Sequence, residues 1–194
     1  MIGQFTTTED RGNQARKLNR VLDLIQGATG SLAGTGVSAA TSAGGKKTVL
    51  TLNNVAIDMT DADTAGTHGS LKVFTFPAGN LLFMGASCNL ALVAGEGGLT
   101  DTAAVVGGLG TAAVGTDNAT LTTTEQNLIP STASTLSGGE GATANVSATA
   151  NIAAFDGSSS AVEAYLNFAA PDAGSTADDT LTVSGTITLY WDVV

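Results

Sequence analysis

The end of the chain alternates between apolar and polar side chains. Residues 181–194 (LTVSGTITLYWDVV) place large apolar residues at every second position, with Thr, Ser and Tyr between them. A period of two is typical of a β-strand with one buried and one open face. The predicted buried residues are Leu181, Val183, Ile187, Leu189 and Trp191. Gly185 predicts a bulge or a close backbone approach, and we expect Trp191, the only tryptophan, to anchor the core or a subunit interface.

The same alternation recurs along the chain from Lys47 onward. It is found in residues 47–59, 71–79, 81–95, 142–155 and 161–169. Pro77–Asn80 has the composition of a turn between the segments 71–79 and 81–95. Asp156–Ser159 and Pro171–Asp179 are the turns of the final third, which therefore reads as three sequential antiparallel strands. Residues 119–129 (ATLTTTEQNLI) predict a further strand, because a run of Thr suits a pleated surface. Residues 95–118 fit either two short strands or a loop.

Two of these segments predict which side chains are buried. In 161–169 the alternation separates an inward set, Val162, Ala164, Leu166 and Phe168, from an outward set, Glu163, Tyr165 and Asn167. In 81–95 the inward set includes Cys88. We interpret Cys88 as a small core residue rather than a reactive thiol, because no Lys, Arg or His lies near it in sequence to lower its pKa.

The beginning of the chain has a helical period instead. Residues 9–26 follow Thr8, a residue suited to capping a helix, and they predict one amphipathic helix. Its apolar stripe is Leu18, Val21, Leu22 and Ile25, and its polar side carries Arg11, Arg16, Lys17 and Arg20. The stripe either covers the β domain or meets the same helix in neighbouring subunits; alternatively, the basic side docks on an acidic partner. Residues 27–45, made of Gly, Ala, Ser and Thr with almost nothing to bury, predict a flexible arm.

Together these patterns predict an all-β protein. About eight strands separated by turn signals are typical of an antiparallel β-sandwich or jelly roll. We therefore expect two parts, an N-terminal helix and arm over residues 1–45 and a β-sandwich domain over residues 46–194.

Composition and charge narrow the function. Charged residues make up 12% of the 194-residue chain, where about 25% is usual, so Thr, Ser, Asn and Gly must form most of the surface. Residues 1–50 hold six basic and three acidic residues, whereas residues 51–194 hold one basic and fourteen acidic residues. The excess of acidic residues over residues 51–194 would repel the phosphates of nucleic acid. No stretch of about 18 apolar residues occurs, so we expect no membrane association.

The residues needed for metal or cofactor chemistry are scarce. One Cys and one His, His68, cannot form a His/Cys metal cluster. A calcium loop starting at Asp61 has Ala65 and Lys72 where ligands are required, although a looser carboxylate site at Asp58, Asp61 and Asp63 stays open. His68 is interpreted as a surface residue. We predict no metal and no cofactor.

Enzymatic activity is not expected either. Glu125, Glu140, Glu163 and Asp156 are the carboxylates that a glycosidase would pair, but the sequence does not define their separation. No phosphate-binding loop of the G-x-x-x-x-G-K-[ST] type is present. A surface made mostly of Thr, Ser, Asn and Gly suits contact with other proteins better than catalysis.

Two segments resemble small structural proteins of tailed bacteriophages. They are VFTFPAGNLLFMGASCNLAL (73–92) and SSSAVEAYLNFAAPDAGSTADDTLTVSGTITLYWDVV (158–194). In that family an F-P-x-G turn precedes one strand and a T-L-T-V-S-G-T-I-x-L-x-W strand closes the chain. The likeness covers about a third of the sequence and includes neither the predicted helix nor residues 95–140.

The resemblance implies a virion protein with a jelly-roll-like fold that decorates or cements a capsid. It implies the major capsid protein as partner, a homotrimer as the assembly, and a location on the capsid surface after assembly in the host cytoplasm. From the residues we expect Arg16, Lys17 and Arg20 to contact the shell, and Leu18, Leu22 and Ile25 to act as oligomer or core anchors. The alternative is a head-fibre or receptor-binding module that binds carbohydrate at the loops near residues 58–63 or 95–118.

Overall fold

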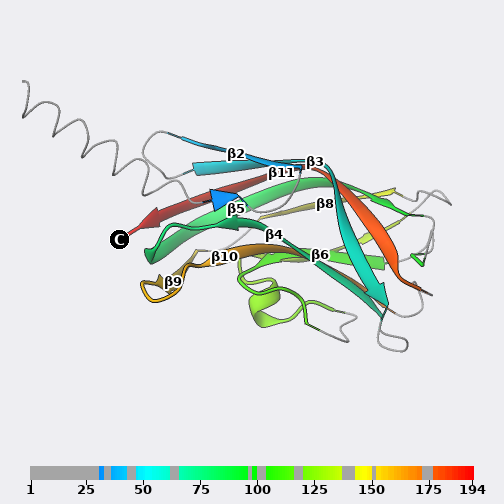
Figure 1. Ribbon diagram of the computed structural model, residues 1–194. Helices are drawn as coiled ribbons and strands as arrows, with labels where there is room; N and C mark the ends of the chain where they lie inside the picture. The colour runs from blue at the N-terminus through cyan, green and yellow to red at the C-terminus, as the bar shows by residue number, and fades with distance from the viewer. Residues whose placement is uncertain are drawn as a thin grey trace, which may run out of the picture.

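A computed structural model shows the arrangement of the chain (Figure 1). It describes residues 31–32, 36–42, 47–61, 66–95, 98–99, 104–115, 120–136, 143–149, 152–171 and 177–194. The predicted helix over 9–26, with Arg16, Lys17, Arg20, Leu18, Leu22 and Ile25, lies outside the described residues.

The regular structure of the described residues is almost entirely β. The strands are β1 (Ser31–Leu32), β2 (Val37–Thr41), β3 (Lys47–Asp61), β4 (Thr67–Thr75), β5 (Gly79–Ala94), β6 (Ala104–Gly110), β7 (Ile129–Thr135), β8 (Thr143–Thr149), β9 (Ala153–Gly157), β10 (Glu163–Ala170) and β11 (Asp179–Val193). One 3-10 turn, η1 (Thr123–Glu125), interrupts them. Every strand pairing is antiparallel, so the predicted antiparallel all-β class is confirmed.

Eight strands follow one another in hydrogen-bonded order, β7-β6-β10-β4-β3-β11-β5-β8. Between β4 and β3 the path turns a corner, because these strands pair only through Thr60 with His68 and Asp61 with Thr67. The strands on the two sides of this corner form two facing layers, β3-β11-β5-β8 and β7-β6-β10-β4 (Figure 1). Strands β2 and β9 add to the first layer, through β3 and β5, and β1 adds to the second through β4.

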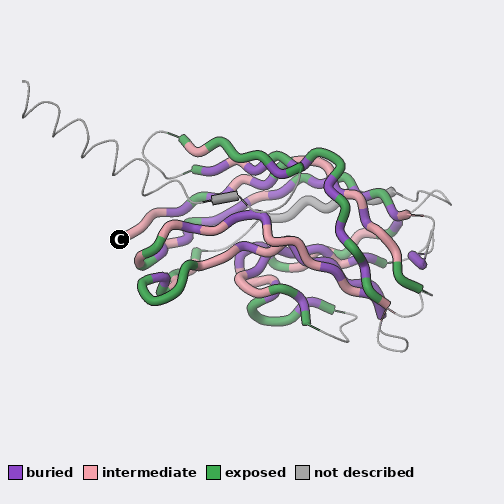
Figure 2. Tube along the Cα trace, in the orientation of Figure 1, coloured by how far each residue is buried: buried purple, intermediate pink, exposed green. Residues whose placement is uncertain are grey.

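The core fills the space between these layers. Figure 2 shows buried and exposed residues alternating along many of the strands, as expected when each strand has one inner face. Aromatic rings gather around Trp191, which is 1% exposed and has its ring centroid 5.7 Å from that of Phe76 and 6.2 Å from that of Phe74. The indole nitrogen of Trp191 donates to the buried hydroxyl of Thr48 at 3.0 Å, so its one polar group is paired.

The closing strand agrees with its sequence pattern. All five residues predicted to face inward on β11 are buried. The strand lies in the middle of its layer, between β3 and β5. Its register with β3 shifts between Val183 and Gly185, and Gly185 has φ +138°. The extra residue of this bulge lies in β3, between Leu52 and Val55, and the pairing of Gly185 with β5 is regular. Of the two alternatives predicted for Gly185, the close backbone approach is confirmed, because an added Cβ would lie 2.2 Å from the carbonyl oxygen of Asn89.

The predicted pairing of the final third is wrong. The sequence suggested hairpins between successive strands, but β10 pairs with β4 and β6, while β11 pairs with β3 and β5. The predicted strand over 142–155 is divided into β8 and β9, which both pair with β5. Turn composition marks where a strand ends but does not say which strand the next one pairs with. A hairpin and a connection that crosses to the other layer use the same residue types.

Residues 119–129 and part of the arm differ from the prediction, while residues 95–118 were left open between short strands and a loop. Residues 119–129 were expected to be a strand, but the structure has η1 there, and β7 begins only at Ile129. In residues 95–118, β6 is the strand that forms, and residues 111–115 form none. Part of the predicted flexible arm is also ordered as β1 and β2, because backbone pairing with β4 and β3 needs few large side chains. The body therefore begins before residue 46.

Candidate functional site

The outward face of β10 is covered along part of its length. Asn167 was predicted to point to solvent, but it is 0% exposed. The covering residues are 111–115 and 120–128, which we call the β6–β7 segment. The amide nitrogen of Asn167 donates to the carbonyl oxygens of Ala112 at 2.9 Å and Glu125 at 2.7 Å. Its amide oxygen accepts from the backbone nitrogen of Val114 at 3.1 Å and from the hydroxyl of Ser70.

Glu125 organises the β6–β7 segment from within. Its carboxylate accepts from the backbone nitrogen of Thr122 at 2.7 Å and of Gly115 at 3.1 Å. The residue is 7% exposed, and donors of the same segment bind its carboxylate oxygens. Asn127 adds a contact by accepting from the backbone nitrogen of Thr111 at 2.9 Å. This internal bonding explains why the polar sequence forms a compact cover instead of a strand.

A groove opens where this cover ends. It has a volume of about 550 Å³ and is lined by Thr111, Ala112, Ala113, Phe155, Asp156, Ser160, Ala161, Val162, Glu163 and Tyr165. We call it the β10 groove. Its residues come from the start of the β6–β7 segment, from β9 and the residues after it, and from the first residues of β10. It therefore lies where elements of both layers meet.

A chain of three polar side chains crosses one side of the β10 groove. The ammonium group of Lys72, on the neighbouring strand β4, lies 2.8 Å from one carboxylate oxygen of Glu163. The hydroxyl of Tyr165 donates to the other oxygen. The hydrogen bonds from Lys72 and Tyr165 lower the pKa of Glu163, while the bond to Glu163 raises the pKa of both Lys72 and Tyr165. At neutral pH the three side chains hold a carboxylate, an ammonium and a neutral phenol, and of these Glu163 and Tyr165 line the groove.

Asp156 supplies a second carboxylate to the groove. One of its oxygens accepts from the hydroxyl of Ser158 at 2.6 Å and from the backbone nitrogen of Ser158 at 3.0 Å. These bonds lower the pKa of Asp156. A glycosidase needs one carboxyl whose pKa is raised so that it can donate a proton, and Asp156 and Glu163 are both shifted the other way. The groove therefore presents hydrogen-bond acceptors rather than an acid and base pair.

The other candidate carboxylates do not join this groove. Glu125 is buried in the β6–β7 segment, and Glu140 lies outside the described residues. Sequence reasoning considered Glu163 and Asp156 only as glycosidase candidates and did not place Tyr165 or Lys72 beside them. The sequence carried one signal for the pairing of Glu163 with Tyr165, because the alternation puts both residues on one face of the predicted strand.

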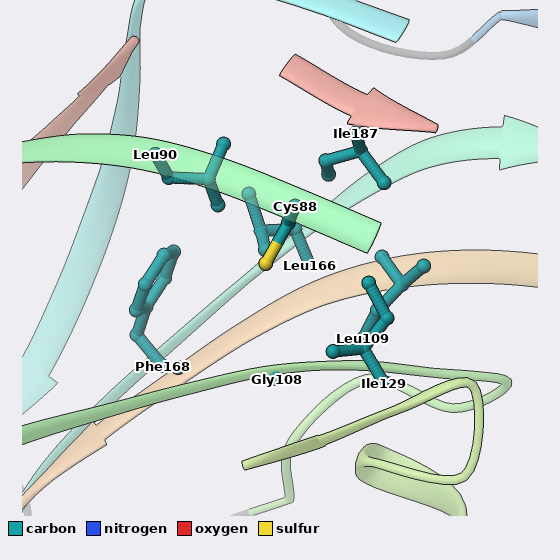
Figure 3. Close-up of a pocket in the computed structure, with 9 residues that line it drawn as sticks. Cys88, Leu90, Gly108, Leu109, Ile129, Leu166, Phe168 and Ile187 are labelled. Carbon is teal, nitrogen blue, oxygen red and sulfur yellow. The ribbon is translucent and has the colours of Figure 1, made fainter. Parts of the chain in front are cut away.

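Cys88 lies in the core beside a small enclosed cavity (Figure 3). The cavity measures about 10 Å³, and Leu90, Ile187, Leu166 and Phe168 are among its lining residues. Apolar cavities of this size stay dry. The interpretation of Cys88 as a small core residue is confirmed.

The predicted carboxylate site has a different setting from the one expected. Asp58 borders an open hollow of about 500 Å³ together with Asp178 and Asp179. The backbone nitrogen of Asp61 donates to a carboxylate oxygen of Asp178 at 2.7 Å, and Asp63 lies outside the described residues. Across the described ranges, no group of three or more His, Cys, Asp or Glu is arranged to hold a metal ion.

His68 is not the surface residue that was predicted. It is half-buried, and its Nδ1 atom is buried without a hydrogen-bond partner. The reason is its position opposite Thr60 at the corner where the two layers join.

Neither family models nor curated proteins match this sequence. Among solved structures, the chain is similar to the enzymatically active domain of tailspike protein 4 of bacteriophage CBA120, with 12% identity and a TM-score of 0.24. The alignment covers 89% of this chain but 20% of the tailspike chain. A likeness this low carries no conclusion about fold or function. Within the described part of the chain, no helix has the length and apolar character needed to span a membrane.

Proposed function

We propose that the chain is a non-enzymatic structural protein of a tailed-phage virion that decorates or cements the capsid as a homotrimer. The order of its strands is the observation that carries this proposal. If the eight strands of the main path are numbered one to eight along the chain, the layers read 1-8-3-6 and 5-4-7-2. We interpret this order as two interlocked Greek keys of a jelly roll, an architecture that viral capsid and lectin domains use, and it supports the proposal.

The segments that resemble phage structural proteins support the same assignment. They include β5, β10 and β11 and the end of β4. These strands lie inside the layers, with a hydrogen-bonded neighbour on each side. The resemblance thus involves strands that would define a shared fold.

We place the attachment to the shell in residues 1–30. They join the described chain at β1, whose Ser31 and Leu32 pair with Thr75 and Phe74 at one end of β4. Arg16, Lys17 and Arg20 would meet an acidic surface of the major capsid protein. Three copies in a trimer hold the second and third contact at a high effective concentration, so weak single contacts add up to durable attachment. Leu18, Leu22 and Ile25 would anchor the trimer or cover the body.

Deletion of residues 1–30 tests this proposal. We expect the shortened chain to stay folded by circular dichroism but to lose co-sedimentation with capsids of the virus that encodes it. A triple variant, Arg16→Ala, Lys17→Ala and Arg20→Ala, separates the basic contact from the apolar stripe and should weaken binding without changing oligomer size. Undiminished capsid binding by the deletion variant would show that attachment does not use these residues.

The number of copies on purified particles tests the role independently. A copy number comparable to that of the major capsid protein is expected for a decoration protein. A few copies per particle would contradict decoration and indicate a tail or vertex component.

A further inference from the structure

We propose that the β10 groove is a binding site for a neutral saccharide. This inference goes beyond shell attachment and does not depend on it, because the groove lies in the β body and the proposed shell contact lies in residues 1–30. An experiment can therefore contradict the saccharide site without contradicting shell attachment, and the reverse is also true.

The size and shape of the groove suit one face of an oligosaccharide. Its volume of about 550 Å³ falls within the range of about 300–1,000 Å³ that is usual for small-molecule sites. It lies open between the β6–β7 segment and the residues that follow β9, so a chain of sugar units can lie along it without being enclosed.

The polar groups of the groove are matched to hydroxyl donors. Asp156 and Glu163 are ionised, and a carboxylate has more acceptor positions than the two donors each one already binds. A sugar offers several hydroxyl donors at short spacing, and hydrogen bonds to ionised acceptors are stronger than neutral ones. Both carboxylates are already held, Asp156 by Ser158 and Glu163 by Lys72 and Tyr165, so little side-chain freedom is lost when a ligand binds.

The apolar part of the groove supplies the second element of sugar recognition. The ring of Tyr165 and the edge formed by Phe155 and Val162 border the same space as the two carboxylates. Phe155 is held in place, since its ring centroid lies 6.5 Å from that of the core residue Phe83. Rigid aromatic side chains with a polar tip suit ligands that present both apolar C–H faces and hydroxyl groups.

The charges of the groove decide against two other ligand classes. A cationic segment, such as residues 9–26 of this chain, would gain little from Glu163, because Lys72 beside the groove already neutralises that carboxylate. An acidic saccharide would bring further negative charge beside Asp156 and Glu163. A neutral sugar needs only the acceptors and the apolar surface.

The experiment measures binding of the full chain to an array of neutral oligosaccharides built from glucose, galactose, mannose and N-acetylhexosamines. The strongest binder is then titrated calorimetrically. We expect Asp156→Asn and Tyr165→Ala each to weaken this binding by about tenfold or more, as loss of a charge-assisted hydrogen bond or of a stacking surface does. The matched controls are Asp58→Asn, an exposed aspartate in the other hollow, and Tyr190→Ala, the exposed tyrosine on β11; both should bind like wild type.

Asp156→Asn keeps the experiment decisive if Tyr165→Ala does not fold, because Asp156 is exposed and bonds only to its own turn. The absence of binding to every neutral oligosaccharide would overturn the proposal. It would also be overturned by equal losses in the control variants, by a preference for acidic sugars, or by a peptide of residues 9–26 binding where the sugars do not.

Discussion

Asn167 shows how one side chain can fix a surface segment. Its amide is buried and makes hydrogen bonds to the backbone of residues 112, 114 and 125 as well as to Ser70. A buried amide with all these partners is stabilising. Without it, the carbonyl oxygens of Ala112 and Glu125 would lose a buried donor, while the backbone nitrogen of Val114 would keep its bond to Ser70 at 2.8 Å. The cover over β10, and hence the wall of the β10 groove, depends on this residue.

Asn167→Ala is therefore expected to lower the free energy of unfolding by about 3 kcal/mol, because each unsatisfied buried polar group costs about 1–3 kcal/mol. Urea denaturation measures this change. Asn89→Ala, at an exposed position on β5, is the control and should stay within about 0.5 kcal/mol of wild type. Equal stability of the two variants would mean that the β6–β7 segment is held by other contacts.

At the scale of the element, β11 organises its layer. It pairs with β3 on one side and β5 on the other over most of its length. The extra residue that β3 carries between Leu52 and Val55 absorbs the register shift, so β11 keeps its buried residues in alternation on both sides of the shift. An added Cβ at Gly185 would lie 2.2 Å from the carbonyl oxygen of Asn89, a backbone atom of the paired strand.

Gly185→Ala should consequently destabilise the protein by about 3 kcal/mol, since it combines an unfavourable φ with a backbone clash. Chemical denaturation with both fluorescence and circular dichroism measures the effect. Gly115→Ala is the matched control, because its added Cβ would come no closer than 3.9 Å to the Glu125 carboxylate, and it should stay within about 1 kcal/mol of wild type. A stable Gly185→Ala variant would contradict the close approach of β11 and β5.

At the scale of the whole molecule, the two layers share one core. Trp191 comes from one layer and packs against Phe74 of the other and against Phe76 just after the same strand. Neither layer can keep its inner face buried without the other, and small domains with a single core usually unfold in one step.

We therefore expect urea unfolding curves from Trp191 fluorescence and from far-ultraviolet circular dichroism to coincide. The single tryptophan reports the contact between layers, while circular dichroism reports the strands of both. A fluorescence transition at lower urea than the loss of strand signal would show that the layers separate before they unfold.

Part of the fold could be predicted from the alternation of residue types. The inner residues of β11, the position of Cys88 and the close backbone approach at Gly185 followed from local patterns. Such features depend on which face of a strand a side chain occupies, and that is set by its neighbours in sequence.

The candidate site could not be predicted in the same way. The polar face of β10 looked uniform in sequence, yet Asn167 is buried while Glu163 and Tyr165 line the groove. Residues 119–129 have the composition of a strand, but Glu125 binds donors from its own segment and turns them into a cover. These outcomes depend on contacts between residues far apart along the chain.

The sequence by itself determined the strand class, the inner face of the closing strand and the division between a basic beginning and an acidic body. Only the tertiary structure decided which strands pair, which polar face is covered and where Asp156, Glu163, Tyr165 and Lys72 meet. The physical reason is that hydrophobic alternation is a local property of the chain. Pairing and covering instead depend on backbone hydrogen bonds, which every residue type except proline can donate and all can accept.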